Sequence, residues 1–416
     1  MFEMIAELER QVSTDAERLA AINRLEQLKA ESAAAQARLT EAFDRSQRSA
    51  ASPLMSPTEV SRSICAQVAL ARQESPARGQ RHVGLALALV RDMPGTLASL
   101  AAGTISEWRA TLLVRETAVL TREDRQTVDR ELHGRLGGAG DRRVADLARS
   151  IAQRLDPGAA MRRNRKAEGD RRVSVRPAPD TMCHLTGLLP VSLGIAAFAA
   201  LRKEALALRN DGDTRTLGQL MADLMYERLT GASAATGPNV EIQLVMSDRT
   251  LLGGSQEPGL LPGHGPVPAA LARRLARESD KAWLRRLYAA PHTGDLVATD
   301  SRRRTFSGRL RELLVLRDQT CRTPWCDAPV AHVDHVRPVH DGGRTTRHNG
   351  QGLCEACNYV KESPGWRVDL VHVRGHVLEI TTPTGRRYRS RAPALPGTDP
   401  SGSAEEKLRR LRDDVA

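Results

Sequence analysis

The sequence predicts an α+β protein with a mainly helical N-terminal region, a small α+β middle region and a cysteine-rich C-terminal module. Three observations predict this class. Hydrophobic residues occupy 40% of the 416 positions but aromatic residues only 3%, so the cores must consist of Ala, Leu and Val, which favours helices. After residue 172 the hydrophobic pattern changes to the alternation typical of strands, and four cysteines cluster between residues 321 and 357. At about 150 residues per domain, the length predicts two or three domains.

Residues 1–48 are predicted to form one amphipathic helix, because their apolar residues follow helical spacing with charges between them. A coiled coil is the alternative, but Asp15, Glu26 and Lys29 fall on the seam of the heptad. We therefore expect this helix to pack on its own domain. Residues 58–155 are predicted to be a helical domain, in which Thr121 and Asp124 have the spacing of a helix start.

Residues 173–300 are predicted to form an α+β region. Strands are expected over 173–175 and 241–245, with helices near 191–209 and 215–230 between them. Residues 251–268 contain nine Gly or Pro in eighteen and are predicted to be a loop. The chain has neither a GxxxxGK[ST] motif nor a GxGxxG between a strand and a helix, so no nucleotide cofactor is expected. Residues 390–416 are expected to form a disordered tail, because they are rich in Pro, Gly and Ser.

The chain is expected to be cytoplasmic. Its acidic start lacks the pattern of a signal peptide. Its longest uncharged run, residues 185–201, is shorter than the ~20 apolar residues of a membrane span and contains Pro190 and Gly194. The net charge is +12, and residues 301–416 contribute +7 from 21 basic and 14 acidic side chains. This basic C-terminal part is the electrostatic pattern of a module that binds nucleic-acid phosphates.

The cysteines of the C-terminal part predict a structural zinc site. They form a CxxxxC pair and a CxxC pair, and each pair can give two thiolates to one tetrahedral ion. In a reducing compartment this clustering indicates metal rather than disulfides. Four thiolates leave no position open for water, so this Zn²⁺ is expected to hold the fold rather than to perform chemistry. The four ligands are Cys321, Cys326, Cys354 and Cys357.

A second cluster between the two cysteine pairs indicates hydrolysis of phosphodiesters. Asp334 and His335 end a predicted strand, Gly342 and Gly343 turn the chain, and the helix after Cys354 carries Asn358 and Lys361. Hydrolysis needs an activated water, a clamp on the phosphate and help for the leaving oxygen. A neutral His supplies a base, and Asp and Asn oxygens suit Mg²⁺.

These residues resemble the HNH nuclease motif of the ββα-metal fold, over roughly residues 306–366 within a module that we place at 306–372. The resemblance implies that His335 is the general base and that Asn349 pins the loop and holds the base in position. It also implies that Asp334 and Asn358 bind a catalytic divalent ion, Mg²⁺ or another ion such as Mn²⁺ or Ni²⁺. Asn358 stands where many relatives have His, which leaves the preferred metal open. Segments upstream, such as 214–229 and 257–276, resemble proteins with an N-terminal domain of unknown function 222 before the HNH module.

Four basic residues are candidates for contacts with nucleic acid. Arg337, Arg344 and Arg347 are expected to position phosphates without specifying sequence. Lys361 is expected to contact phosphate as a point charge, with a plain surface lysine as an almost equal alternative.

The sequence thus predicts a metal-dependent HNH endonuclease whose partner is DNA. The alternative is a non-catalytic zinc-ribbon protein that only binds DNA. A helical interaction scaffold formed by residues 1–155 is compatible with either. Whether the protein acts alone or as a homodimer, and whether it prefers DNA or RNA, stays open.

Overall fold

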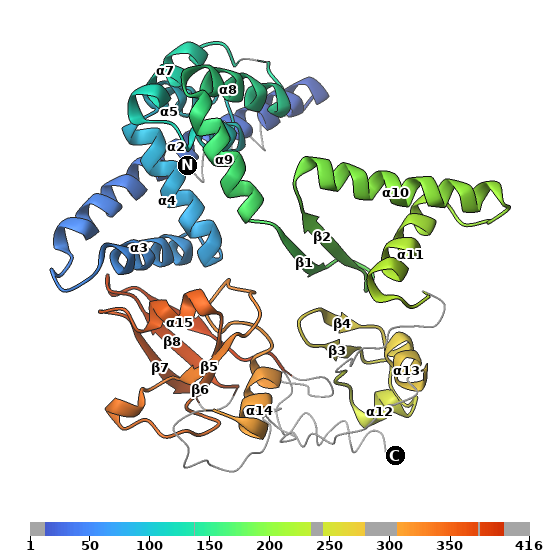
Figure 1. Cartoon of the computed structure of the whole chain (residues 1–416). Coiled ribbons are helices and arrows are strands. Elements are labelled where there is room, and N and C mark those ends of the chain that lie inside the picture. The colour runs from blue at the N-terminus through green and yellow to red at the C-terminus, as the bar shows by residue number, and fades with distance from the viewer. Residues whose placement is uncertain (1–12, 137, 234–243, 279–305, 373–374, 395–416) are drawn as a thin grey trace. The chain divides into compact units, whose positions relative to one another are not determined.

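The computed structural model describes residues 13–136, 138–233, 244–278, 306–372 and 375–394, whose helices and strands are drawn in Figure 1. The chain divides into two compact units, Met1–Arg162 with Tyr288–Ala394 and Arg163–Leu287 with Leu395–Ala416. The first unit contains the N-terminal helices and the cysteine-rich module. Helices predominate in the described residues and the sheets there have two or three strands, which confirms the predicted α+β class.

The N-terminal part of the first unit is all helical. Its elements are α2 (Asp15–Ala50), α3 (Pro57–Ala71), α4 (Pro76–Arg91), α5 (Pro94–Ala101), α6 (Glu107–Thr117), α7 (Arg122–Leu132) and α8 (Asp141–Leu155). Residues 1–12 of the predicted first helix lie outside the described residues. Helix α9 (Pro157–Gly169) leads from this unit into the second one.

Several helix starts in this part are fixed by side chains that accept hydrogen bonds from free backbone N–H groups. The Thr14 hydroxyl caps α2 by accepting from the N–H of Glu17, and the Glu17 carboxylate accepts from the N–H of Thr14. The Thr121 hydroxyl accepts from the N–H of Asp124 at 3.2 Å. The helix start predicted at Thr121 is therefore confirmed.

The helical core is built from small and aliphatic side chains, as the low aromatic content requires. One face of α2 buries Ala30, Ala33, Ala34 and Ala37, at the spacing of successive helical turns. These short side chains allow close packing of α2 on α4 and α5, whose larger buried residues include Leu89.

Among the described helices, no single one is long and apolar enough to cross a membrane. Helices α4 and α5 pass that test only as a pair, and a bend of 107° separates them. Both contribute buried residues to the helical core.

The second unit contains short sheets and helical hairpins. Strands β1 (Arg172–Pro177) and β2 (Cys183–Leu188) pair antiparallel, and α10 (Val191–Asn210) packs on α11 (Leu217–Thr230). The strand predicted at 173–175 and the two predicted helices are thus confirmed. Of the strand predicted at 241–245, residues 241–243 lie outside the described residues, and Val245 forms a single bridge with Leu260.

The prediction of a plain loop over 251–268 is wrong. This segment contains the last residue of the short helix α12 (Asp248–Leu251) and a hairpin of β3 (Gly259–Leu261) and β4 (Gly265–Val267). Gly263 and Gly265 have positive φ angles of 80° and 100°, so the glycines that suggested a loop form the turn of this hairpin. Helix α13 (Ala269–Glu278) follows directly after Pro268.

The cysteine-rich module contains the remaining elements. They are α14 (Gly308–Asp318), β5 (His332–His335), the 3₁₀ turn η2 (Val339–Asp341), β6 (Gly350–Leu353), α15 (Glu355–Lys361), β7 (Arg367–His372), β8 (Val377–Thr381) and β9 (Arg387–Ser390). Strands β7, β8 and β9 form an antiparallel sheet in that order. Of the predicted disordered tail, residues 395–416 lie outside the described residues.

Candidate active site and metal centre

The four predicted zinc ligands come together in the module. The Sγ atoms of Cys321, Cys326, Cys354 and Cys357 all lie within 4.8 Å of one another. Cys326 Sγ lies 3.7 Å from the Sγ atoms of both Cys354 and Cys357. Sulfurs bound at about 2.3 Å to one tetrahedral Zn²⁺ are separated by about 3.8 Å, so the spacing fits this ion.

The chemistry of these thiols also fits a cation. Hydrogen bonding within the cluster, with Cys321 as the largest contributor, lowers the pKa of Cys354 and raises the pKa of Cys357. Without a cation the thiols cannot all ionise, because their negative charges repel one another. A bound Zn²⁺ removes this conflict, and the cluster therefore has the composition and geometry of a closed structural zinc site.

Strands β5 and β6 and helix α15 position the second cluster. The two strands pair antiparallel, with Asp334 opposite Gln351 and His335 opposite Gly350. Helix α15 starts directly after β6, where Cys354 Sγ accepts from the N–H of Cys357 and caps the helix. One of the predicted zinc ligands thus also fixes the start of the helix that carries Asn358 and Lys361.

His335 is buried, with 7% of its surface exposed, and is held on three sides. Its Nε2 is hydrogen-bonded to Thr345 Oγ1 at 2.9 Å, and the ring of Phe306 packs against it with centroids 4.6 Å apart. Its Nδ1 lies 3.8 Å from Asp334 Oδ1. Burial lowers the pKa of His335, while the Asp334 carboxylate opposes this shift. The imidazole is therefore neutral near pH 7, which is the form a base requires.

Asn349 fastens the loop between the two strands. Its Oδ1 accepts from the N–H of Arg337 at 2.8 Å, and its Nδ2 donates to the carbonyl oxygens of Arg337 and Arg344 at 3.0 and 2.9 Å. A Cβ atom on Gly343 would lie 1.8 Å from the Arg337 carbonyl oxygen, so only glycine fits this turn. The side chain of Asn349 thus holds both sides of the loop that carries Thr345.

Asp334 and Asn358 are the predicted ligands of a catalytic ion. The oxygens of Asp334 have partners in the protein, whereas the side-chain oxygen of Asn358 has none among the described residues. Asp334 Oδ1 accepts from the N–H of His335 at 2.8 Å, and Asp334 Oδ2 lies 2.9 Å from Lys361 Nζ. Asn358 Oδ1 is buried and, within the described part of the chain, is the one buried side-chain nitrogen or oxygen without a hydrogen-bond partner. An orphaned carboxamide oxygen is costly unless something binds it, and a hard cation such as Mg²⁺ accepts oxygen ligands of this kind.

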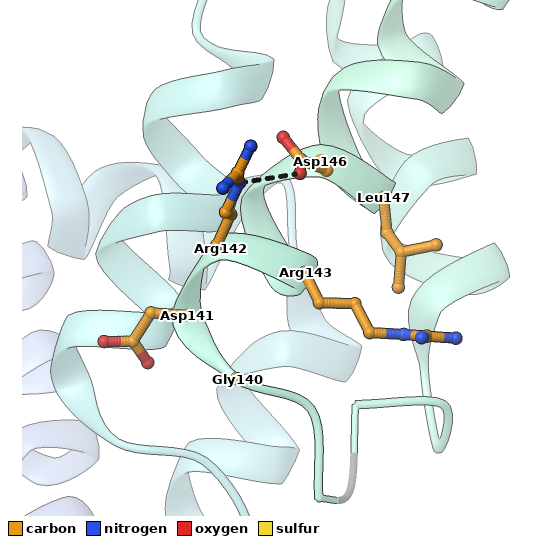
Figure 2. Close-up of a pocket in the computed structure, with 6 residues that line it drawn as sticks. All are labelled: Gly140, Asp141, Arg142, Arg143, Asp146 and Leu147. Carbon is orange, nitrogen blue, oxygen red and sulfur yellow. Dashed lines mark ion pairs between the residues drawn. The ribbon is translucent and has the colours of Figure 1, made fainter.

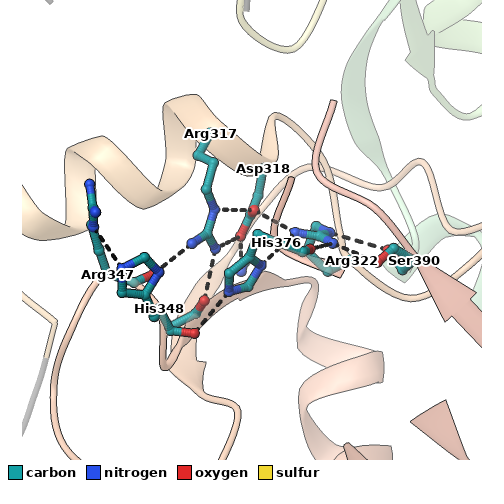
Figure 3. Close-up of polar contacts among 9 residues, drawn as sticks. Arg317, Asp318, Arg322, Arg347, His348, His376 and Ser390 are labelled. Carbon is teal, nitrogen blue, oxygen red and sulfur yellow. Dashed lines mark hydrogen bonds and ion pairs between the residues drawn. The ribbon is translucent and has the colours of Figure 1, made fainter. Parts of the chain in front are cut away.

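A buried polar network, which the sequence did not indicate, holds the backbone of the loop around Asn349 (Figure 3). Arg317 donates to the carbonyl oxygens of Arg347 and Gly350 at 2.6 and 2.8 Å, and His376 Nε2 donates to that of His348 at 2.9 Å. The carbonyl oxygen of Asn349 accepts from the N–H of Val336 at 2.8 Å. Four consecutive carbonyl groups around Asn349 are therefore fixed.

One buried carboxylate offsets the positive charge of the arginines in this network. Asp318 Oδ1 accepts from Arg317 and Arg322 at 2.8 and 2.9 Å, and Asp318 Oδ2 accepts from the N–H of Gly352 at 2.7 Å. Burial raises the pKa of Asp318, but the guanidinium groups of Arg317 and Arg322 beside the carboxylate hold it below its usual value. The only sign of this network in the sequence is the neighbouring Arg317 and Asp318 at the end of α14, and such pairs are common on protein surfaces.

The predicted phosphate-binding residues lie in different environments. Arg337 and Arg344 are exposed, as a contact with nucleic acid requires. Arg347 is half-buried, and its Nε donates to His348 Nε2 at 3.0 Å. The side chain of Lys361 is covered beside Asp334 rather than on the open surface, with 8% of it exposed.

A separate hollow lies at the start of α8 in the helical part, lined by Gly140, Asp141, Arg142, Arg143, Asp146 and Leu147 (Figure 2). Its carboxylates are paired, Asp146 with Arg142 at 3.9 Å and Asp141 with Arg109 at 3.1 Å. None of the predicted site residues lines it.

Two family models match this chain. The model for the domain of unknown function DUF222 matches residues 19–318, which is more than half of the chain. This chain belongs to the DUF222 family. The model for HNH endonuclease matches residues 319–363, which contain both cysteine pairs and the cluster around His335. The resemblance to both is thus confirmed, and the HNH domain supports a nuclease-type function and implies nucleic acid as the substrate.

Similar proteins match this chain over different lengths. The uncharacterized protein Rv3776 of Mycobacterium tuberculosis (strain ATCC 25618 / H37Rv) is 28% identical over 376 residues, which cover 77% of this chain and 68% of that protein. The uncharacterized protein Rv2100 of the same strain is 34% identical over 129 residues, which cover 30% of this chain and 22% of that protein. No solved structure matches.

Proposed function

We propose that this DUF222 protein is a metal-dependent endonuclease that hydrolyses phosphodiester bonds in DNA. One observation carries the proposal: the Nδ1 atom of the buried His335 lies 3.8 Å from Asp334 Oδ1, and Asp334 Oδ2 contacts Lys361 of the helix on which Asn358 has its orphaned, buried oxygen. A protein that only binds DNA through a zinc ribbon has no need of this combination. The exposed Arg337 and Arg344 beside it supply contacts for a phosphate backbone.

Asp334 and Asn358 are the residues that would hold the divalent ion. One carboxylate and one carboxamide are a small set of protein oxygens, as suits Mg²⁺, which keeps several waters. When bound, such an ion polarises the scissile phosphate and stabilises the leaving oxygen. The zinc of the four cysteines supplies rigidity only, because its coordination is closed.

His335 acts as the general base in this proposal. When Nε2 donates its proton to Thr345 Oγ1, the lone pair is on Nδ1, which then takes the proton from the attacking water. Phe306 and the Thr345 hydroxyl fix the plane of the ring. Asn349 positions the loop from which Thr345 reaches the imidazole.

The test is cleavage of supercoiled plasmid DNA by zinc-loaded protein, without added divalent ion and with Mg²⁺, Mn²⁺ or Ni²⁺. His335→Ala is compared with His332→Ala, which changes an exposed histidine on the same strand. We expect cutting that needs an added ion, persists in His332→Ala and falls by a factor of about 10² to 10⁴ in His335→Ala.

Two outcomes contradict the proposal. Equal cutting by His335→Ala and the wild type means that another group is the base or that a contaminating nuclease is present. If neither protein cuts while both retard DNA in a gel, the zinc-ribbon DNA-binding function is correct. Zinc content, measured for each variant, shows whether the module is folded.

A further inference from the structure

We infer that Lys361 is an internal counter-cation for Asp334, which a divalent ion must displace before it can bind. The inference rests on the proposed function, since it assigns the control of metal binding to a residue of the same site. Lys361 Nζ lies 2.9 Å from Asp334 Oδ2, the carboxylate oxygen that is not already occupied by the N–H of His335.

The burial of Lys361 indicates a specific role. Its side chain is 8% exposed, and lysines are rarely buried to this extent unless they are paired. The Asp334 side chain is 31% exposed, so solvent and ions reach this carboxylate. A divalent ion that approaches Asp334 therefore meets a carboxylate that a buried ammonium already neutralises.

Helix geometry places Lys361 next to the second proposed ligand. Residues three apart on a helix lie on the same face, and Lys361 follows Asn358 by three positions on α15. The positive charge on Asp334 thus comes from the same helix face that offers the orphaned Asn358 oxygen. A cation bound by both oxygens stands close to the ammonium and is repelled by it.

The structure also supplies a second partner for the displaced ammonium. Lys361 Nζ contacts the Glu362 carboxylate, whose side chain is 53% exposed. When Lys361 leaves Asp334, its charge remains paired with Glu362. Lys361 thus neutralises the charge of Asp334 when no divalent ion is bound, and it keeps Glu362 as its partner when an ion takes Asp334.

The inference predicts that removing the ammonium strengthens binding of a divalent ion. Lys361→Met keeps the length of the side chain and removes its charge, whereas Lys361→Arg keeps the charge. We expect the dissociation constant for Mn²⁺ to fall by about tenfold or more in Lys361→Met, the scale of one charge–charge interaction at short range, and to change little in Lys361→Arg. Lys29→Met, at a lysine of α2 paired with Glu26, controls for the loss of one positive charge from the chain.

The measurement is a titration of zinc-loaded, full-length protein with Mn²⁺, in which the electron paramagnetic resonance signal reports free ion. Asp334→Asn is titrated in parallel. If Asp334→Asn binds Mn²⁺ as tightly as the wild type, the proposed catalytic metal site is wrong, and this inference falls with it. If Asp334→Asn weakens binding while Lys361→Met and the wild type bind equally, only the role of Lys361 is wrong.

A second measurement uses the wild-type protein and does not depend on the folding of a variant. Acetylation of lysines with an amine-specific reagent, read by mass spectrometry, is compared with and without saturating Mn²⁺. We expect the reactivity of Lys361 to rise on addition of Mn²⁺ while that of Lys29 is unchanged. Unchanged reactivity of Lys361 at saturating Mn²⁺ would show that the ammonium stays on Asp334.

Discussion

The indole Nε1 of Trp366 donates a hydrogen bond to the hydroxyl of Ser63 at 3.0 Å, across 303 positions of the chain. Ser63 lies on α3 of the helical part, and Trp366 lies just before β7 of the HNH module. Two further contacts join α3 to other parts of the module, the turn between β8 and β9 and helix α15. Thr384 Oγ1 donates to Gln67 Oε1 at 2.9 Å, and the guanidinium of Arg62 lies 4.9 Å from the centre of the Tyr359 ring.

Helix α3 therefore packs against the HNH module and contributes to its stability. A small apolar cavity between them is lined by residues of α3 such as Ala66 and Leu70, and by Val360, Trp366 and Ile380 of the module. The DUF222 match and the HNH match meet in this interface, since residues 19–318 include α3. The DUF222 segment is therefore packed against the domain that bears the proposed chemistry.

We predict that a fragment of residues 306–394 is less stable than the same module in the full chain. The fragment loses the partners of Trp366, Thr384 and Tyr359 and exposes the apolar surface that α3 covers, at about 1 kcal/mol for each hydrogen bond and more for the apolar area. The measurement is urea-induced release of zinc to a coloured chelator. Equal midpoints for fragment and full chain would show that α3 does not stabilise the module.

We predict that Cys354→Ser abolishes zinc binding and unfolds the module. Binding of a structural zinc by small modules has an apparent free energy of about 10–16 kcal/mol, and Cys354 also caps α15. Cys183→Ser is the matched control, because Cys183 is exposed and lies outside the cluster. Zinc content by atomic absorption and protection against proteolysis check both variants. A folded, zinc-containing Cys354→Ser protein contradicts the four-ligand site.

We predict that His376 makes the module lose stability in acid. Its Nδ1 accepts from Arg322 and its Nε2 donates to the His348 carbonyl oxygen, so only one neutral tautomer fits. Burial, with Arg317 contributing, lowers the pKa of His376 to about 3. In the unfolded chain the value is about 6.5, so the unfolded state binds the extra proton between these two values.

The stabilisation by His376 is therefore complete above pH ~6.5 and decreases as the pH falls toward 3. Between pH 7 and 5 one such group costs about 2 kcal/mol of the free energy of unfolding. Urea unfolding at both pH values is compared for the wild type, His376→Asn and the exposed control His332→Asn. Asn tolerates the positive φ of 43° at position 376. If His376→Asn loses as much free energy of unfolding between pH 7 and 5 as the wild type does, other groups cause the acid sensitivity.

We predict that the cleavage rate rises with pH through a value below 6.5 and is flat above it. Burial lowers the pKa of His335, and a bound divalent ion shifts it in the same direction, so the neutral base is already dominant at pH 7. Thr345→Val removes the partner of Nε2 and is expected to lower kcat by about tenfold or more while the protein stays folded. A rate that is independent of pH from 5 to 8 contradicts His335 as the base.

The candidate site is predictable from sequence because its information is local. The two cysteine pairs, the Asp-His pair and Asn358 lie within 38 positions, and their chemistry follows from residue type and spacing. The positions of His335, Asn349 and the cysteines on the strands, loop and α15 agree with the predicted pattern. Their catalytic roles stay predictions until cleavage is measured.

The segment 251–268 shows where local information misleads. Its glycines and prolines are equally compatible with a loop and with a tight hairpin. The pairing of β3 with β4, in which Leu260 lies opposite Pro266, shows that the segment forms a hairpin. Strand pairing of this length depends on what packs against it, which composition does not reveal.

By itself, the sequence determined the α+β class and the four-cysteine cluster, and it identified the family. These follow from hydrophobic period and from motif spacing, which are properties of neighbouring residues. Only the tertiary structure decided that Lys361 pairs with Asp334, that Arg317 and His376 hold the loop around Asn349, and that Trp366 rests on α3. Each of these contacts joins segments that are distant in the chain, and burial rather than sequence pattern selects the partner.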